Sequence, residues 1–226
     1  MISEMFAHGF IQRAFIGGVL VSLCAALLGV SLVLKRYSMI GDGLSHVSFG
    51  ALSIAIALGF APIKFSIPIV IIAAFFLLRL AENGKMKSDA AIAMVSASSL
   101  AIGVIVTSLT TGLSTDVCSY MFGSILAMSK DDVIFSVVLS VVVLIMFGFC
   151  YHRIFAVTFD ESFSKATGVK VGMYNTLISI FTAVTVVLGI KMMGAMLISS
   201  LIIFPALTSM RVFKSFLSVT ICSAIL

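Results

Sequence analysis

The stretch FIQRAFIGGVLVSLCAALLGVSLVL, residues 10 to 34, carries one charged residue, Arg13, in an otherwise largely apolar run. About 20 consecutive apolar residues are enough for a helix to cross the hydrocarbon core of a bilayer. The run is too long for the apolar core of a secretory signal peptide, and the basic pair Lys35 and Arg36 follows it rather than preceding it. The stretch therefore predicts a membrane-spanning helix.

The remainder of the chain has the same apolar character. Of its 226 residues, 61% are hydrophobic and only 10% are charged, and the mean hydropathy is +1.27. A soluble domain carries about 25% charged residues, so a soluble fold of this length would leave too much apolar surface in water. We expect an all-α, polytopic transmembrane helical bundle, with the chain embedded in membrane lipid.

Apolar runs long enough to span a membrane recur along the chain, which predicts about eight spans in a single transmembrane domain covering residues 1–226. The last run reaches Leu226 too early to cross a bilayer, so we expect either a fragment or an incomplete final helix, with the C-terminal end truncated. The runs cover residues 10–34, 43–60, 62–80, 89–110, 132–150, 173–190, 193–210 and a stretch from 213 onward.

The basic residues orient these spans. If the first span ends in the cytoplasm, ten of the 14 Lys and Arg residues fall in cytoplasmic connections and four fall outside. Such a bias is typical of the positive-inside rule. It predicts an extracytoplasmic N-terminus, a cytoplasmic connection at 151–172 and an external connection at 111–131.

Several classes of function are excluded by missing patterns. The phosphate-loop pattern G-x-x-x-x-G-K-[ST] and the hydrolase patterns G-x-S-x-G and H-E-x-x-H do not occur in the sequence. The net charge of +5 comes from scattered residues without a basic, aromatic-interleaved patch, so nucleic-acid binding is not expected. The four cysteines form no C-x-x-C pair. We expect neither an enzyme nor a permanently bound cofactor.

Asp42 and His46 are the two ionisable residues that stand at the start of the second apolar run. Residues four apart lie on one face of a helix, with about 6 Å between their Cβ atoms, and carboxylate with imidazole suits zinc, manganese or iron. Two structural interpretations compete: Asp42 is the N-cap of the helix, or His46 pairs with Asp42 or a backbone carbonyl. Ionisable groups within spans are costly and typically mark a transport pathway.

Two connections have patterns of their own. In the 151–172 connection, Phe159, Phe163 and Ala166 fall at helical spacing and Gly168 follows as a stop signal, which predicts a short amphipathic helix. Such a helix either docks on a cytoplasmic partner or merely lies in the membrane interface. The stretch SYMFGSILAMSKDD, residues 119 to 132, predicts either a short re-entrant helix or a bent start of the fifth span.

Four blocks together resemble the membrane permease subunit of bacterial ABC transporters for zinc, manganese or iron. They are KRYSMIGDGLSHVSFGALSIA at 35–55, YMFGSILAMSKDD at 120–132, FDESFSKATGVKV at 159–171 and MMGAMLISSLIIFPALTSMR at 192–211. The blocks occur in the family's order over nearly the whole chain. The chain departs from the family pattern in two ways. Position 50 is glycine, where some members carry an acidic residue, and the chain stops earlier than such permeases usually do.

The resemblance implies a multi-pass permease of the bacterial plasma membrane that imports a divalent metal ion. It implies a homodimer of permeases, separate cytoplasmic ATP-binding subunits and an extracytoplasmic metal-binding protein, with alternating access driven by ATP. Asp42 and His46 would be metal ligands in the path, the metal being cargo. The segment with Phe159, Asp160, Phe163, Ala166 and Gly168 would contact the ATPase.

Two other transporters remain alternatives at this point. A permease for an iron–siderophore or cobalamin shares the general layout, but a large organic ligand needs no Asp/His relay. A secondary metal transporter driven by an ion gradient would have no ATPase partner and usually contains inverted internal repeats.

Overall fold

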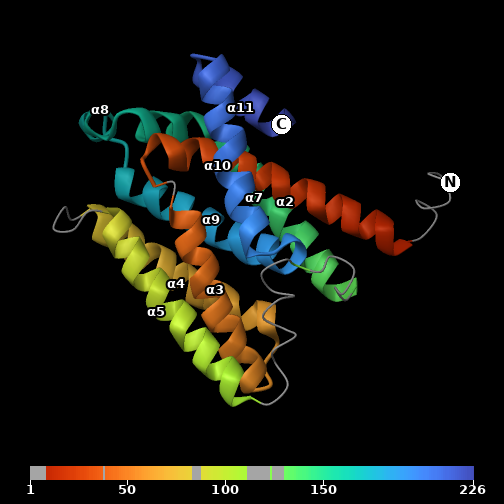
Figure 1. Cartoon of the computed structure of the whole chain (residues 1–226). Helices are drawn as coiled ribbons and strands as arrows, with labels where there is room; N and C mark the ends of the chain where they lie inside the picture. Colours follow the sequence, from red (N-terminus) through yellow and green to blue (C-terminus); the bar gives the residue numbers. More distant parts are fainter. Residues whose placement is uncertain (1–8, 38, 83–87, 111–122, 124–129) are drawn as a thin grey trace.

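The computed structural model describes residues 9–37, 39–82, 88–110, 123 and 130–226, and the regular structure in these ranges is entirely helical (Figure 1). The all-α expectation is therefore confirmed for this part of the chain. The helices are α2 (Gly9–Leu34), α3 (Ile40–Ala57), α4 (Pro62–Glu82), α5 (Ser88–Leu109), α7 (Lys130–Phe159), α8 (Glu161–Ala166), α9 (Val171–Met193), α10 (Ala195–Val212) and α11 (Phe216–Ile225).

Six helices in the described ranges are long and apolar enough to cross a membrane: α2, α3, α5, α7, α9 and α10. The chain is thus a polytopic helical membrane protein. The apolar stretch Lys64–Leu77 of α4 and the helix α11 are shorter than this measure requires. Both coincide with expected spans, and their crossing of the membrane stays a prediction, as does the total of eight.

The fifth apolar run is longer than the sequence indicated. We expected it to end near 150, but α7 continues without a break to Phe159. At 1.5 Å per residue, its 30 residues span about 45 Å, which exceeds a hydrocarbon core of about 30 Å. The polar residues Tyr151, His152 and Arg153 lie inside the helix, because Ile154 and Val157 continue the buried stripe beyond them. The part of the expected connection at 151–172 that runs up to Phe159 therefore belongs to α7.

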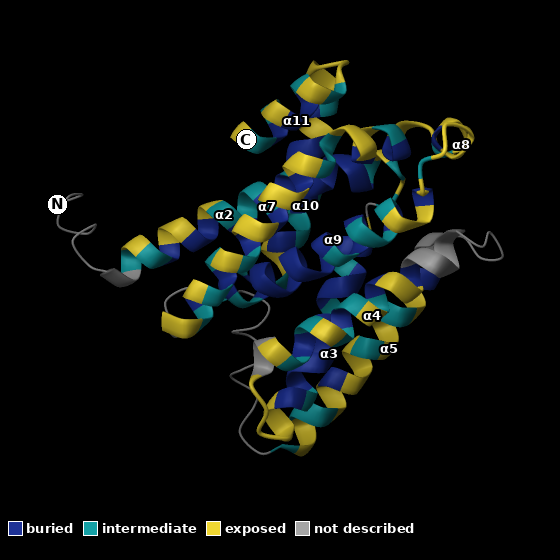
Figure 2. Ribbon diagram, turned by 180° about the vertical axis from the view of Figure 1, so that it is seen from behind, coloured by how far each residue is buried: buried dark blue, intermediate teal, exposed yellow. Residues whose placement is uncertain are grey.

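The helix α9 forms the centre of the bundle. All ten residues from 181 to 190 are buried, and α9 packs against α2, α3, α4, α7 and α10 (Figure 2). By contrast, α5 and α7 present large apolar side chains outward, including Met94, Ile105 and Phe149. Such outward faces are expected of helices that contact lipid, where apolar surface carries no cost.

Two ion pairs show which connections share an end of the bundle. Lys35, just after α2, pairs with Glu161 of α8 at 2.8 Å. Lys191, near the end of α9, pairs with Asp132 at the start of α7 at 3.0 Å. The α2–α3 turn and α8 therefore lie together, and the α7 start and α9 end lie together. This grouping agrees with the sides that the basic residues assigned to these connections.

Close packing of α3 against α5 fixes the position of the second span. A Cβ atom built on Gly50 would come within 2.8 Å of the backbone oxygen of Ser99 in α5. On α5, a Cβ atom built on Gly103 would meet the ring of Phe49 of α3 at 2.6 Å. The two backbones approach closely because both positions are glycine, as is common between membrane helices.

Candidate functional site

Asp42 and His46 are exceptions on an otherwise buried helix. From Ile40 to Ser53, every residue of α3 is buried except these two. Their side chains are 46% and 29% exposed, respectively. The helix therefore presents a single open stripe, and both of its residues can ligate a metal.

This stripe lies between two packed faces of α3. Gly41, one residue before Asp42, lies against Ile202 of α10, and Gly43, one residue after it, lies against Ile92 of α5. Successive residues on a helix are about 100° apart. Asp42 therefore points between α10 and α5, and the bundle leaves that direction uncovered.

Asp42 and His46 lie within ion-pair distance of each other, as the pairing interpretation expected, but they do not make a hydrogen bond. Nε2 of His46 lies 3.7 Å from Oδ2 of Asp42, beyond the usual range for a hydrogen bond to nitrogen. In the described part of the structure, no backbone carbonyl accepts a bond from His46. The two ligand atoms face each other across a gap in which an ion could bridge them.

The N-cap interpretation of Asp42 is wrong. The helix α3 begins at Ile40, its N-cap position is Met39, and Asp42 lies inside the first turn. A carboxylate there still stabilises the helix by interacting with the partial positive charge of its N-terminus. It does so, however, without satisfying a backbone N–H group through a capping bond.

A third ligand on the same helix is excluded by packing. Gly50, one turn beyond His46, is buried, and a side chain at this position would run into the backbone of Ser99. No group of three or more His, Cys, Asp or Glu residues that could hold a metal occurs among the residues that the structure describes. Further ligands must therefore come from water or from outside this set of residues.

The expected short helix is present as α8, with well-formed ends. The Asp160 carboxylate accepts a bond of 2.9 Å from the Phe163 N–H and caps the first turn. At the other end, the N–H groups of Gly168 and Val169 donate to the carbonyls of Lys165 and Ser164, which is the Schellman arrangement. Gly168 has a φ of 81°, as the expected stop requires.

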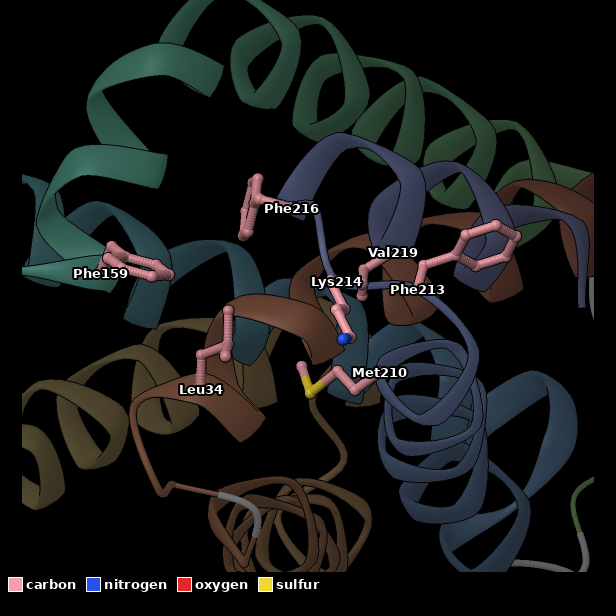
Figure 3. A pocket seen from close by; sticks show the side chains of 7 residues that line it. All are labelled: Leu34, Phe159, Met210, Phe213, Lys214, Phe216 and Val219. Atoms are coloured by element: carbon pink, nitrogen blue, oxygen red, sulfur yellow. The ribbon is translucent and has the colours of Figure 1, made fainter.

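All five residues expected to contact an ATPase are exposed: Phe159, Asp160, Phe163, Ala166 and Gly168. One detail of the short-helix prediction is wrong. Phe159 is the last residue of α7 rather than part of the short helix. Its ring lines a pocket of about 310 Å³ that is bounded by the ends of α2 and α7 and by α10 and α11 (Figure 3).

This pocket is apolar and unsuited to a cation. It has one charged side chain, Lys214, whose ammonium points into it (Figure 3). No residue of α3 lines it, so it is separate from Asp42 and His46. The lining residues are Leu34, Phe159, Met210, Phe213, Lys214, Phe216 and Val219.

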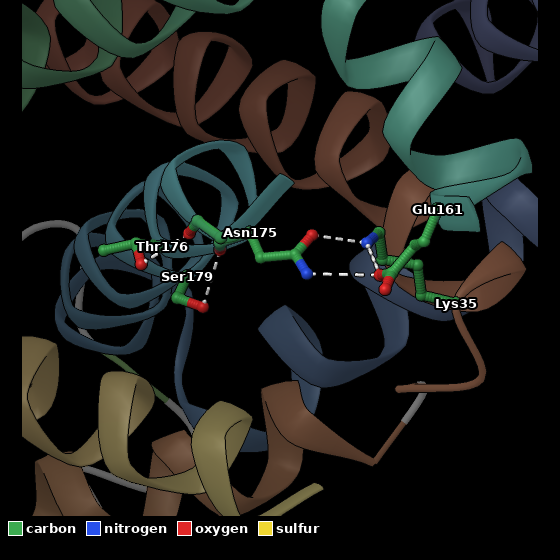
Figure 4. Close-up of polar contacts among 6 residues, drawn as sticks. Lys35, Glu161, Asn175, Thr176 and Ser179 are labelled. Atoms are coloured by element: carbon green, nitrogen blue, oxygen red, sulfur yellow. Dashed lines mark hydrogen bonds and ion pairs between the residues drawn. The ribbon is translucent and has the colours of Figure 1, made fainter. Parts of the chain in front are cut away.

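A polar cluster that the sequence reading missed ties α8 to the bundle (Figure 4). The Lys35 ammonium donates to Glu161 Oε1 at 2.8 Å and to Asn175 Oδ1, and the Asn175 amide donates to Glu161 Oε1 at 3.1 Å. Partial burial acts to raise the pKa of Glu161. The hydrogen bonds from Lys35 and Asn175, with the charges of Lys35 and Lys165, outweigh it and hold that pKa below its usual value.

At the opposite end of the bundle, two of the sequence blocks meet. Gly123 lies against the joint between α9 and α10, where a Cβ atom on it would collide with the backbone of Met193 and Gly194. Gly194 is the single residue between these helices and has a φ of 88°. The expected re-entrant segment at 119–132 and the connection at 111–131 fall largely outside the described residues, so that prediction stays open.

In the described ranges, six helices that are long and apolar enough to cross a membrane define the class of a polytopic helical membrane protein. The particular family follows from comparison with known proteins. The chain belongs to the ABC 3 transport family, whose model matches residues 7–226. The resemblance that the four sequence blocks indicated is confirmed.

Named relatives cover most of the chain. A "Probable metal transport system membrane protein" of Treponema pallidum is 32% identical over 94% of this chain and 80% of its own length. The "Manganese import system permease protein ScaB" of Streptococcus gordonii is 28% identical over 96% of this chain and 78% of its own. The "High-affinity zinc uptake system membrane protein ZnuB" of Buchnera aphidicola is 32% identical over 86% of this chain and 75% of its own length.

Solved structures support the same assignment. The structure of PsaBC from Streptococcus pneumoniae in complex with Fab matches with a TM-score of 0.84 and 28% identity, over 100% of this chain and 82% of the other. A metal-chelate type ABC transporter in an inward-facing conformation matches with a TM-score of 0.74 and covers 95% of this chain and 72% of the other. At 17% identity it supports the fold alone.

Family membership settles several expectations. The chain is a permease subunit of a bacterial ABC transporter, a multi-pass membrane protein and a transport component rather than an enzyme. A permease of this kind works with an ATPase and a binding protein.

Proposed function

We propose that the chain is the permease of an ATP-driven importer for a divalent transition-metal ion, and that Asp42 and His46 are ligands along the ion path. The observation that carries this proposal is the open stripe of α3, where two metal-ligating side chains face the same uncovered direction. A carboxylate and an imidazole have no obvious packing role there, since neither is buried.

Two copies of the permease would complete the path. Each copy offers two protein ligands, and a divalent ion needs at least four. A second copy facing the stripe would add an Asp42 and a His46 of its own, with water filling the remaining positions. A relay site must bind weakly enough to release its cargo, and an incomplete protein ligand set meets that need.

Alternating access would connect the path to ATP. The extracytoplasmic binding protein would dock near the 111–131 connection and release the ion between the two copies. Closure of the cytoplasmic ATPases would move α8, whose Phe163 is 63% exposed and available for contact. The ten basic residues assigned to the cytoplasm support this orientation, with an extracytoplasmic N-terminus.

Zinc and manganese are the favoured cargo, and iron is a further candidate. Relatives with 28–32% identity are named for manganese import and zinc uptake. One carboxylate and one imidazole discriminate poorly among these ions. Selection of the metal would then depend largely on the binding protein.

The test replaces one ligand and follows the metal. His46→Ala should abolish uptake of zinc or manganese into proteoliposomes that contain the assembled transporter, because only one protein ligand per copy remains. The variant should still assemble with its ATPase, since the His46 side chain makes no hydrogen bond in the described structure. His152→Ala, which removes an exposed histidine of α7, serves as the matched control. Normal uptake by the His46 variant would refute the relay role.

The siderophore or cobalamin alternative is tested in the same assay. The fold does not exclude it, because a metal-chelate type transporter shares this fold. Competition of uptake by free zinc or manganese distinguishes the two cargoes. An ion-gradient mechanism is disfavoured by membership in an ABC family, and uptake that needs ATP but no gradient would exclude it.

A further inference from the structure

The cluster of Lys35, Glu161 and Asn175 joins three elements that are far apart in the sequence. Lys35 follows α2, Glu161 is the first residue of α8, and Asn175 lies in the second turn of α9. Each of the three side chains bonds to both others, which closes a ring (Figure 4). A closed ring of this kind holds its members in one geometry more firmly than a single pair does.

Because the cluster is largely buried, removing one of its three side chains would leave the other two with unsatisfied polar groups. The Lys35 side chain is 6% exposed and Asn175 is 3% exposed, while Glu161 opens toward the surface at 39%. An ammonium group in such a setting is stable only when it is paired. If Glu161 moved away with α8, it would leave a buried cation without its counter-ion, so Lys35 must move too.

Glu161 is the point through which α8 is attached by side-chain hydrogen bonds. The other polar contacts of this short helix are internal: Asp160 caps Phe163, and Thr167 donates to the carbonyls of Phe163 and Ser164. Among the described residues, Glu161 alone bonds from α8 to another element through its side chain. Besides its chain connections to α7 and α9, α8 would therefore pass a force on its exposed face to Lys35 and Asn175 through Glu161.

Lys35 also begins the short turn that leads into α3. The turn is tightly bonded, with the Tyr37 N–H donating to Leu32 at 2.9 Å and the Ile40 N–H donating to Tyr37 at 3.0 Å. Helix α3 then begins at Ile40, and Asp42 lies in its first turn. Only four residues separate Lys35 from the start of α3, so a shift of Lys35 is passed over a short connection to the helix that carries Asp42 and His46.

We propose that Lys35, Glu161 and Asn175 form the link that converts movement of α8 into movement of α3 and α9. The three are positioning residues: they touch neither nucleotide nor metal. This inference rests on the proposed function, since it assumes that α8 is moved by the ATPase and that Asp42 and His46 act on the cargo. It adds the residues that connect the two.

The experiment measures metal uptake and ATP hydrolysis in the same proteoliposomes, with the permease, its ATPase and the metal-loaded binding protein. Glu161→Gln keeps the shape of the side chain and removes its charge, and Lys35→Met removes the other charge. Each should lower the metal transported per ATP hydrolysed by about tenfold, the factor expected when a charge-assisted hydrogen bond is lost. Hydrolysis itself should continue, because the nucleotide site is on another chain.

Lys170→Met is the matched control, because this lysine lies just before α9, is exposed and makes no ion pair in the described part of the structure. Its uptake per ATP should equal that of the wild type. The charge-swapped double variant Lys35→Glu with Glu161→Lys should recover part of the loss, which a damaged fold would not do.

Three outcomes would overturn the link. The first is an unchanged ratio in Glu161→Gln and Lys35→Met, and the second is an equal loss in Lys170→Met. The third is failure of Glu161→Gln to assemble, which would make the cluster purely structural. Failure of the proposed function looks different: the wild-type complex itself would transport neither zinc nor manganese.

Discussion

Glu161 is a carboxylate whose ionisation the surrounding side chains determine. Burial acts to raise the pKa of Glu161, but the two hydrogen bonds to its Oε1, together with the charges of Lys35 and Lys165, outweigh burial and lower that pKa. The ionised form is therefore favoured in the folded protein more than in an unfolded chain. Such a difference makes stability depend on pH.

The direction of that dependence can be worked out for Glu161. Because its pKa is lowered on folding, its stabilisation is fully present above the ordinary value of 4.5 and is lost as the pH falls through the lower folded-state value. Wild-type protein in detergent should thus unfold at a higher temperature than Glu161→Gln near neutral pH. The gap should close as the pH falls below 4.5. A gap that stays constant down to about pH 3 would contradict this assignment.

Some functional residues can be recognised from the sequence alone, and others cannot. Asp42 and His46 could be singled out, because ionisable groups at the start of an apolar run are rare and costly. The cluster of Lys35, Glu161 and Asn175 could not be singled out. Glu161 and Asn175 follow Lys35 by 126 and 140 positions, and no local pattern joins them. Asn175 did carry a usable signal, namely an amide inside an apolar run.

The packing of α3 against α5 depends on the absence of side chains at a few positions. At Gly50 the two backbones are so close that even a methyl group would meet the Ser99 carbonyl at 2.8 Å. Backbone atoms cannot rotate away as the end of a side chain can. The helices would have to separate to make room.

Gly50→Ala should therefore destabilise the protein by about 1–3 kcal/mol, the usual cost of overpacking a tight contact. Thermal unfolding in detergent measures the change. Gly148→Ala is the control, because a Cβ atom there meets nothing within 4 Å. That variant should be neutral or slightly more stable, since alanine favours helix over glycine. Equal behaviour of the two variants would show that α3 and α5 are packed less closely than described.

Helix positions follow well from apolar runs, and helix ends follow less well. Seven of the runs both begin and end within a few residues of a helix, but α7 extends beyond its run through Tyr151, His152 and Arg153 to Phe159. Polar residues suggested an end, while tertiary packing of Ile154 and Val157 kept the helix going. Their spacing after Phe147 continues the same buried stripe, so periodicity was the better guide than polarity.

The whole molecule has two ends that the ion pairs group separately. Lys35 with Glu161 marks one end, and Asp132 with Lys191 marks the other. The sequence predicts that the first of these is cytoplasmic, from the distribution of Lys and Arg. The grouping itself supports the alternation of sides.

Thiol labelling distinguishes the two orientations. In a variant without Cys24, Cys118, Cys150 and Cys222, a cysteine in place of Lys64 should react with an impermeant maleimide in intact cells. A cysteine in place of Lys165 should react only after permeabilisation, because α8 would face the cytoplasm. Gly148→Cys, on the lipid-facing side of α7, should react in neither case. The reverse pattern for Lys64 and Lys165 would invert the topology.

The glycine at position 50 also bears on how this permease can change over time. Gaining a third ligand on α3 would need an acidic residue at Gly50 together with a compensating retreat of α5 around Ser99. Neither change alone is favourable, so single-step selection for tighter metal binding is blocked on this helix. Under laboratory selection for a new metal preference, we therefore expect the first successful substitutions to arise on other helices or in the binding protein.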